Sequence, residues 1–407
     1  MIKIGIIGKT NAGKTTFFNA ATSLSAEVST YPFTTKKPNI GKAYVQTICA
    51  CKELKVKDNP VNSLCIDGWR FIPVELIDLP GLIKDAWRGK GLGIQFLNIA
   101  AQADALLHIV DASGSIDKEG RLTRPGVGNP VLDVYDIEEE IVMWFMSNLE
   151  RNMEKIMKQI EKTKAPLEKA FYEILAGAKV KIEHIREALS ALNLNEKDIR
   201  EWSKEDLRNF ARKIRELSKP TIIVANKMDI AYADANFERL RDEFKDMFVV
   251  PCSSEAELAL RRAEQKGFIK YIPGEETFKV IDESKLTNEQ KWALNYVQQR
   301  VFSRLMRTGV QFAINLCVFK LLKMNTVYPV EDPTNLSDKK GNILPDVFLV
   351  PPNATVKDLA AQIHTDLAKT MIYAIDARTG LRLPTDYVIR DRDIISIVSS
   401  ARKKSKA

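Results

Sequence analysis

The feature that most constrains the fold is a glycine-rich loop that follows a short apolar run near the N-terminus. Residues 4–7 read Ile-Gly-Ile-Ile, which predicts a buried strand of a parallel sheet. Residues 8–15 read GKTNAGKT and match G-x-x-x-x-G-K-[ST], the pattern of a loop whose backbone N–H groups hold phosphates. Residues 16–20 favour a helix, whose positive N-terminal end would face the phosphates. This order predicts an α/β fold that binds a nucleoside triphosphate.

Residues of this loop have separate expected roles. Lys14 would reach the β- and γ-phosphates, and Thr15 would offer its hydroxyl to Mg²⁺. The residues expected to contact the nucleotide are Gly8, Lys9, Thr10, Asn11, Ala12, Gly13, Lys14, Thr15 and Thr16.

A second strand and loop indicate which base is bound. Residues 220–225 read as a buried strand, and Asn226, Lys227, Met228 and Asp229 follow as an N-K-x-D pattern. The Asp229 carboxylate can accept hydrogen bonds from N1–H and the 2-amino group of guanine, whereas adenine lacks this pair of donors. The stem of Lys227 would pack along the base plane. The pattern therefore predicts guanine recognition.

Residues 249–254 read as a strand followed by a small-residue turn, and backbone N–H groups near Ser254 would contact the guanine O6. Ser253 and Ser254 are therefore expected to contact the nucleotide. This signal is informative only through its order in the chain.

Two further motifs would hold the metal and sense the γ-phosphate. Residues 74–81 form a strand that ends in D-x-x-G, so Asp78 would hold Mg²⁺ through water and the Gly81 N–H would bond the γ-phosphate. In the YPFTT segment at residues 31–35, Thr35 would complete the Mg²⁺ coordination, with Thr34 as the alternative. Lys14, Thr35 and Gly81 are thus the expected catalytic residues, and Thr15, Thr35 and Asp78 the expected Mg²⁺ ligands.

The position directly after D-x-x-G predicts slow hydrolysis. Many small GTPases have a water-orienting glutamine there, and this chain has Leu82. Asn11 either assists a K⁺ ion beside the phosphates, which would stabilise the transition state, or only braces the loop. Arg88 could act as an arginine supplied in cis, although a solvent-exposed loop arginine is the simpler interpretation.

These motifs, in this order, resemble translation-factor-type GTPases and, more closely, the Obg family. Residues 31–41 follow the YPFTT…PN-G first switch of that family, and residues 81–93 resemble its glycine-rich second switch. The YchF-like branch is most similar, because it combines a helical insertion in the G domain with a C-terminal TGS domain. YchF carries an N-x-x-E type motif and prefers ATP, so the N-K-M-D sequence implies a sister subgroup that binds GTP.

The expected architecture is a P-loop G domain with a doubly wound, mostly parallel sheet. It would comprise residues 1–137 and 219–310, split by a helical insertion at 138–218, followed by a TGS-like β-grasp domain at 324–400 and a basic tail at 401–407. Apolar residues recur at helical spacing through 141–160, a second helix is expected over 167–192, and Ser203 would cap a third. The β-like runs are 327–330, 347–350, 373–376 and 394–398, with a helix over 355–367.

Charge leaves the macromolecular partner open. The net charge of +8 permits an RNA or ribosome partner, yet residues 138–218 contain 16 Lys and Arg and 16 Asp and Glu, which argues against a basic RNA clamp there. No run of about 18 uncharged apolar residues occurs, so we expect no contact with a membrane. We also expect the protein to be cytoplasmic and monomeric. The alternatives to a GTPase switch are a nucleotide-gated RNA- or ribosome-binding adaptor with negligible turnover, and an ATP-preferring P-loop hydrolase.

Five cysteines do not form a disulfide framework. Cys49, Cys51 and Cys65 lie close in sequence, but structural zinc usually has four ligands, and the three histidines are distant. We therefore expect ordinary reduced thiols, with a metal site as the alternative.

Overall fold

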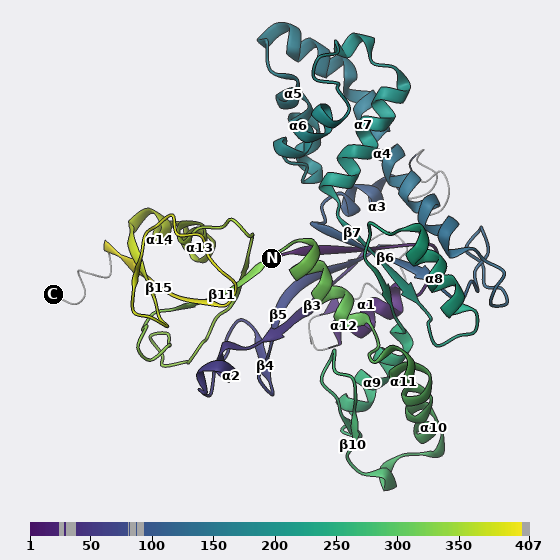
Figure 1. The fold of residues 1–407 in the computed structure, drawn as a ribbon, viewed down its shortest axis with the longest axis vertical. Coiled ribbons are helices and arrows are strands. Elements are labelled where there is room, and N and C mark those ends of the chain that lie inside the picture. Colours follow the sequence, from purple (N-terminus) through teal and green to yellow (C-terminus); the bar gives the residue numbers. More distant parts are fainter. Residues whose placement is uncertain (24–27, 30–37, 80, 82–86, 88–92, 401–407) are drawn as a thin grey trace. The chain divides into compact units, whose positions relative to one another are not determined.

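The computed structural model describes residues 1–23, 28–29, 38–79, 81, 87 and 93–400. The chain forms two compact units, one of residues 1–43 and 74–313 and the other of residues 44–73 and 314–407 (Figure 1). Residues 44–73, which we expected within the G domain, thus group with the C-terminal residues. Among the described residues, no helix has the length and apolar character needed to cross a membrane.

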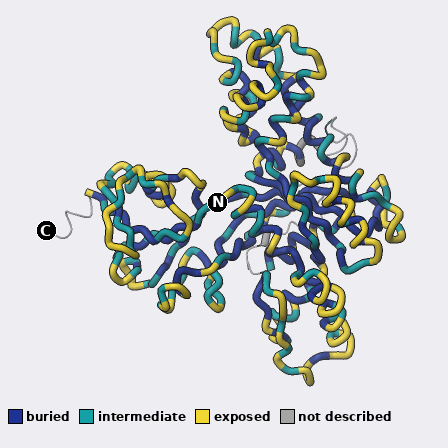
Figure 2. The backbone as a smooth tube through the Cα atoms, viewed as in Figure 1, coloured by how far each residue is buried: buried dark blue, intermediate teal, exposed yellow. Residues whose placement is uncertain are grey.

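The first unit is built on a mostly parallel sheet, which confirms the predicted fold class. The strands lie in the order β2-β3-β5-β1-β6-β7-β8, and β4 pairs with the start of β5 inside residues 44–73 of the second unit. Their bounds are β1 (Lys3–Ile7), β2 (Val28–Ser29), β3 (Asn39–Ile48), β4 (Leu64–Ile66), β5 (Trp69–Asp78), β6 (Ala105–Asp111), β7 (Thr221–Asn226) and β8 (Val249–Pro251). Every residue of β6 and β7 is buried, because helices cover both faces of a doubly wound sheet (Figure 2).

Helices surround this sheet and extend the first unit. Their bounds are α1 (Lys14–Thr22), α3 (Gly93–Ala100), α8 (Ala233–Glu243), α9 (Ser254–Gln265), α10 (Asn288–Val297), the π-helical turn η5 (Gln298–Phe302) and α11 (Ser303–Leu305). The helix α12 (Val310–Leu316) follows, and a small antiparallel pair, β9 (Ile269–Lys270) and β10 (Lys279–Val280), lies between α9 and α10 in the chain.

The helical insertion begins earlier and is more broken than expected. The helix α4 (Pro130–Thr163) starts eight residues before residue 138, because the Asn129 side chain caps it by accepting from the Val131 N–H. The prediction of one helix over 167–192 was wrong: the structure has α5 (Leu167–Leu175) and α6 (Ile182–Ala191). Lys179 between them has a left-handed backbone with φ 54°, which no α-helix can continue through.

The last helix of the insertion begins where its capping sequence predicts. The helix α7 (Lys204–Ser218) starts after Ser203, whose hydroxyl accepts from the Asp206 N–H while the Asp206 carboxylate accepts from the Ser203 N–H. Its apolar side packs against α4 and α6 around a core that includes Phe145, Phe171 and Phe210.

The second unit contains a five-stranded sheet in the order β12-β11-β15-β13-β14. The strands are β11 (Asn325–Val330), β12 (Phe348–Val350), β13 (Met371–Asp376), β14 (Arg382–Leu383) and β15 (Asp393–Ser399), which confirms the predicted β-like runs. The helix expected over 355–367 is divided into α13 (Val356–Ile363) and α14 (Thr365–Thr370), because His364 is extended with φ −161°. A short helix, α2 (Ala50–Leu54), belongs to residues 44–73.

Candidate nucleotide-binding site

The predicted motifs meet at one edge of the parallel sheet. Strand β1 pairs in parallel with β5 and β6, β6 pairs with β7, and β7 pairs with β8. The phosphate-binding loop, Asp78, Asn226 and Ser253 each stand at or directly after the carboxyl end of one of these strands. Ligands of open α/β sheets bind at this edge, so the topology alone brings distant parts of the sequence together.

Two glycines of the loop have backbones that a side chain would not allow. Gly8 has φ 143° and Gly13 has φ 100°. A Cβ added to Gly8 would lie 2.3 Å from the carbonyl oxygen of Ile109, and one added to Gly13 would lie 2.2 Å from Nδ2 of Asn226. The glycine pattern therefore reflects close packing of the loop against β6 and the N-K-x-D segment as well as its turn.

The loop lysine is held inside the turn. Lys14 is 6% exposed, and its Nζ donates to the Lys9 carbonyl oxygen at 2.8 Å. Burial lowers the pKa of Lys14 to about 8, although the charge of Asp78 opposes this shift. Burial removes the water that would stabilise the charged form of Lys14. An anionic phosphate beside Nζ would stabilise that charged form instead.

Two of the three residues expected to hold Mg²⁺, Thr15 and Asp78, lie side by side. The Thr15 hydroxyl donates to Oδ2 of Asp78 at 2.9 Å, and Asn39 Nδ2 lies 3.4 Å from the same oxygen. Within the described part of the chain, buried Oδ1 of Asp78 has no hydrogen-bond partner, and burial raises the pKa of this carboxyl while the Thr15 hydrogen bond opposes the shift. A hydroxyl beside an unsatisfied carboxylate oxygen fits a hard divalent cation.

Gly81, the predicted γ-phosphate sensor, also approaches the loop. A Cβ added to Gly81 would lie 2.2 Å from Oγ1 and 2.7 Å from the backbone nitrogen of Thr10. Only a glycine permits this approach. Thr34, Thr35, Leu82 and Arg88 lie outside the described residues, so their positions stay predictions.

Asn226 joins the phosphate loop to the base-recognition loops. Its Nδ2 donates to the Ala12 carbonyl at 3.0 Å, and its Oδ1 accepts from the Ser254 N–H at 3.0 Å. Both parts of the side-chain amide are used, and the residue is 2% exposed. This asparagine therefore fixes three predicted segments relative to one another.

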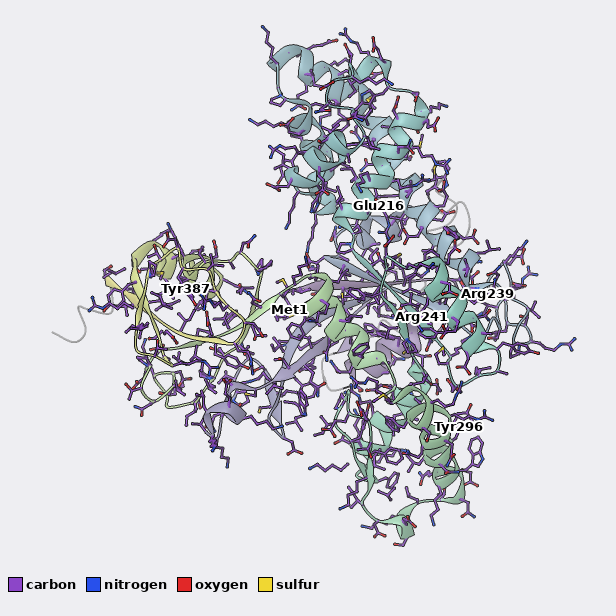
Figure 3. All side chains as sticks on the ribbon, in the orientation of Figure 1. Met1, Glu216, Arg239, Arg241, Tyr296 and Tyr387 are labelled. Carbon is purple, nitrogen blue, oxygen red and sulfur yellow. The ribbon has the colours of Figure 1, made fainter. Side chains whose placement is uncertain are left out.

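The predicted guanine-reading carboxylate is oriented by two hydroxyls. Ser253 Oγ donates to Oδ1 of Asp229 at 2.7 Å, and the hydroxyl of Tyr296, which is labelled in Figure 3, lies 3.3 Å from Oδ2. No sequence pattern indicated Tyr296, which belongs to α10 and lies 67 positions along the chain from Asp229. A pocket of about 490 Å³ opens beside them, lined by Asp229, Ile230, Ala231, Asp234, Tyr296, Arg300 and Arg304.

Lys227 is held by a buried carboxylate at the end of β6. Its Nζ lies 2.7 Å from Oδ2 of Asp111, which is fully buried, and 3.2 Å from Oγ of Ser115. The backbone of Lys227 is left-handed, with φ 63°. These contacts fix the ammonium end of the Lys227 side chain, and the packing of its stem along a base plane stays a prediction. Asp111 was not among the predicted site residues. Its position at the end of a strand was the sequence signal that could have identified it.

The phosphate loop makes further contacts that sequence patterns did not indicate. Lys9 forms ion pairs with Asp133 and Asp136 in the first turns of α4, and Asn11 Nδ2 donates to the Gly120 carbonyl at 2.9 Å. In the second switch segment, the backbone N–H of Trp87 lies 3.2 Å from Oε2 of Glu140 on α4. The loop and the switch thus both contact the helix that leads into the insertion.

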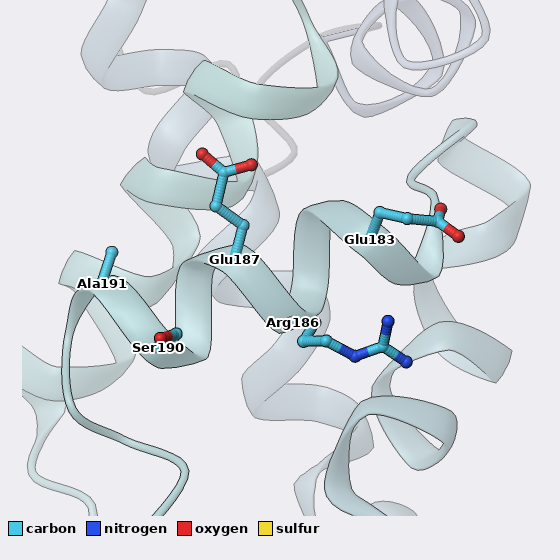
Figure 4. A pocket seen from close by; sticks show the side chains of 5 residues that line it. All are labelled: Glu183, Arg186, Glu187, Ser190 and Ala191. Atoms are coloured by element: carbon cyan, nitrogen blue, oxygen red, sulfur yellow. The ribbon is translucent and has the colours of Figure 1, made fainter. Parts of the chain in front are cut away.

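A second hollow, of about 400 Å³, lies on the helical insertion (Figure 4). All five lining residues belong to α6, which makes the hollow a feature of one helix surface: Glu183, Arg186, Glu187, Ser190 and Ala191. None of them belongs to the nucleotide motifs.

Comparison with known families agrees with this geometry along nearly the whole chain. Residues 3–227 match the family described as 50S ribosome-binding GTPase, and residues 224–332 match the Obg-like GTPase YGR210-like, G4 motif-containing domain. Residues 337–399 match the TGS domain.

Individual relatives cover between about two thirds of the chain and nearly all of it. The chain is 47% identical over 402 residues to GTP-binding protein MJ1332 of Methanocaldococcus jannaschii. The match covers 99% of this chain and 100% of that protein. It is 29% identical over 275 residues to the ribosome-binding ATPase YchF of Bacillus subtilis, with 64% and 68% covered. The crystal structure of a GTP binding protein from Pyrococcus horikoshii OT3 has a TM-score of 0.77, 38% identity, and coverage of 98% and 100%.

The fold and the site together define a GTP-binding P-loop protein. The chain belongs to the Obg-like GTPase family, with a YGR210-like G4 region and a C-terminal TGS domain. The resemblance inferred from its motifs is thereby confirmed.

Proposed function

We propose that this protein binds GTP together with Mg²⁺, hydrolyses the GTP slowly, and uses the two nucleotide states as a switch at the ribosome. The observation that carries the proposal is the position of Asn226, which hydrogen-bonds to Ala12 of the phosphate loop and to the N–H of Ser254. This link supports the proposal, because it connects the segment that carries Asp229 to the phosphate-binding loop.

The residues that would hold Mg²⁺ are Thr15, Asp78 and Thr35. When bound, Mg²⁺ would neutralise charge on the β- and γ-phosphates. The contribution of the chain is electrostatic and positional. Lys14 places one cationic group inside the loop, and the Gly81 N–H would donate to the γ-phosphate in the triphosphate state only.

Slow turnover follows from the residue after Gly81. Leu82 has no group that can orient a water molecule, so the intrinsic rate depends on positioning and charge alone. We propose that K⁺ supplies additional charge. Asn11 uses its Nδ2 on Gly120, which leaves the amide oxygen as the atom that would ligate the ion.

The proposed ribosome partner is supported by the relatives and by the domain composition. The B. subtilis YchF relative is named a ribosome-binding ATPase, and this chain combines a related G domain with a TGS domain and a net charge of +8. Such a charge favours contact with a polyanionic surface.

The test is phosphate release from GTP, measured with and without ribosomes, together with ribosome co-sedimentation in the GTP and GDP states. The proposal predicts slow release that ribosomes accelerate, and co-sedimentation that depends on the nucleotide. Nucleotide-dependent co-sedimentation without turnover under any condition would instead support the adaptor, which Leu82 favours. Co-sedimentation that is absent in both states would contradict the ribosomal part of the proposal.

A further inference from the structure

Three cysteines and one aspartate of the second unit converge on a single point. Cys49 and Cys51 flank the start of α2, Cys65 lies in β4, and Asp58 belongs to the loop between them. One ligand atom from each, namely three Sγ atoms and one carboxylate oxygen, all lie within 4.8 Å of one another. Sequence spacing indicated only three candidate ligands, because nothing in the pattern singled out Asp58 among the acidic residues.

Two of the six separations between the ligand atoms are close to the edges of a metal tetrahedron. With Zn–S bonds of about 2.3 Å and a Zn–O bond of about 2.0 Å, tetrahedral coordination places two sulfurs about 3.8 Å apart and a sulfur and an oxygen about 3.5 Å apart. Cys51 Sγ lies 3.8 Å from Cys65 Sγ, and Cys49 Sγ lies 3.2 Å from Oδ2 of Asp58. A disulfide needs sulfurs about 2.05 Å apart, and all three cysteines are free thiols.

The surroundings suit an anionic metal centre. Three thiolates and one carboxylate around Zn²⁺ would carry a net charge of −2, which needs compensation in a buried position. Arg70 is fully buried, and its Nη2 lies 3.1 Å from Oδ2 of Asp58. The Cys51 N–H donates to Cys49 Sγ at 3.5 Å, as backbone groups do around metal thiolates.

Arg70 also connects the cluster to the C-terminal part of the same unit. Its Nη1 donates to Ser63 Oγ at 3.0 Å and its Nη2 donates to the Leu344 carbonyl at 2.8 Å. Its guanidinium lies 5.3 Å from the centre of the Tyr328 ring. A metal that fixes Asp58 would therefore also fix the guanidinium that joins residues 44–73 to residues 314–400.

We propose that Cys49, Cys51, Cys65 and Asp58 form a structural Zn²⁺ site that stabilises the second unit. Four protein ligands close the coordination sphere, which distinguishes a structural zinc from a catalytic one with an open position. Sulfur-rich coordination selects Zn²⁺ over Mg²⁺, so this site is separate in chemistry from the one at the nucleotide.

The experiment is elemental analysis of the full chain, produced in zinc-supplemented medium and purified under reducing conditions without chelators. The expected result is about one zinc per chain, retained after gel filtration. The zinc-depleted protein should take up Co²⁺ with thiolate charge-transfer absorption and the visible bands of tetrahedral cobalt. Cys51→Ser and Cys65→Ser should each lose at least about nine-tenths of the zinc, whereas Cys317→Ser, at a buried cysteine of the same unit outside this cluster, should retain it.

The wild-type measurements keep the proposal falsifiable even if a variant does not fold. Zinc below about a tenth per chain, together with no thiolate–cobalt absorption, would overturn it. A stoichiometric iron content, or a Cys51–Cys65 disulfide in the protein purified without reductant, would also overturn it.

Discussion

Lys9 in the phosphate-binding loop forms a buried ion pair with Asp133 in the first turn of α4. The Nζ and Oδ1 atoms are 2.6 Å apart, and both side chains are 8% exposed. The helix α4 continues for 34 residues and packs against α5 and α7 of the insertion. The phosphate loop and the helical insertion thus share one continuous helix, which gives the insertion a direct physical connection to the nucleotide.

Removing Asp133 should destabilise the first unit strongly. Asp133→Ala leaves the Lys9 charge buried without its main partner, for which we expect a loss of about 3–5 kcal/mol in the free energy of unfolding. Asp136→Ala is the matched control, because Asp136 pairs with the same lysine at 3.1 Å but is 58% exposed, and it should cost less than about 1 kcal/mol. Urea unfolding measures both values. Equal losses in the free energy of unfolding would show that the burial of Asp133 does not determine how much its ion pair with Lys9 contributes.

GTP affinity should fall as pH rises through the pKa of Lys14. Burial lowers this pKa to about 8, whereas a bound phosphate favours the charged form, so binding takes up a proton at higher pH. Linkage limits the effect to about tenfold in affinity per pH unit between pH 8 and 9. For the nucleotide-free chain the sign is opposite: the unfolded state holds more protons above pH 8, so this lysine's contribution to stability rises with pH.

Calorimetry in two buffers of different ionisation heat measures the proton uptake directly. We expect an uptake approaching one proton at pH 9 and close to none at pH 7. An affinity that stays constant from pH 7 to pH 9, without proton uptake, would contradict the lowered pKa.

The elements that sequence patterns predicted well are those with a local cause. Glycines at positive φ, a serine that caps its own helix and strand-end motifs are all determined by neighbouring residues. The parallel sheet then brings the motifs to one edge without further information.

The features that were missed depend on contacts between distant segments. Tyr296 reaches Asp229 across 67 positions, and Lys9 reaches Asp133 across 124. Asp58 resembles any other loop aspartate until folding places it beside Cys49. The break in the helix expected over 167–192 depends on Lys179, which adopts a left-handed backbone that lysine does not favour locally.

Turnover should depend on the monovalent cation. If the amide oxygen of Asn11 ligates K⁺ beside the phosphates, GTP hydrolysis should be at least about tenfold faster in KCl than in NaCl, equivalent to about 1.4 kcal/mol of transition-state stabilisation. Asn11→Ala should abolish the difference. Equal rates in the two salts would remove K⁺ from the mechanism and leave Asn11 as a brace to Gly120, detectable as an equal loss in both salts.

Tyr296→Phe should weaken GTP binding modestly. The hydroxyl lies near both Oδ2 and the carbonyl oxygen of Asp229, and its loss removes a hydrogen bond to a charged group worth about 1.5 kcal/mol or slightly more, about tenfold in affinity. Tyr232→Phe is the control, because Tyr232 is 64% exposed and follows the same motif. Isothermal titration with GDP measures both, and equal affinities in the two variants would remove Tyr296 from the site.

The most direct test of the central claim is equilibrium binding of GTP, ATP and XTP to the wild-type chain and to Asp229→Asn. Asp234→Asn serves as the control, since Asp234 instead pairs with Arg304. The wild-type chain and the control should bind GTP at least about a hundredfold more tightly than ATP, because adenine leaves the carboxylate unpaired. Asp229→Asn should reverse the preference from GTP to XTP. Equal affinities of the wild-type chain for ATP and GTP, or an unchanged GTP affinity in Asp229→Asn, would contradict guanine recognition by this site.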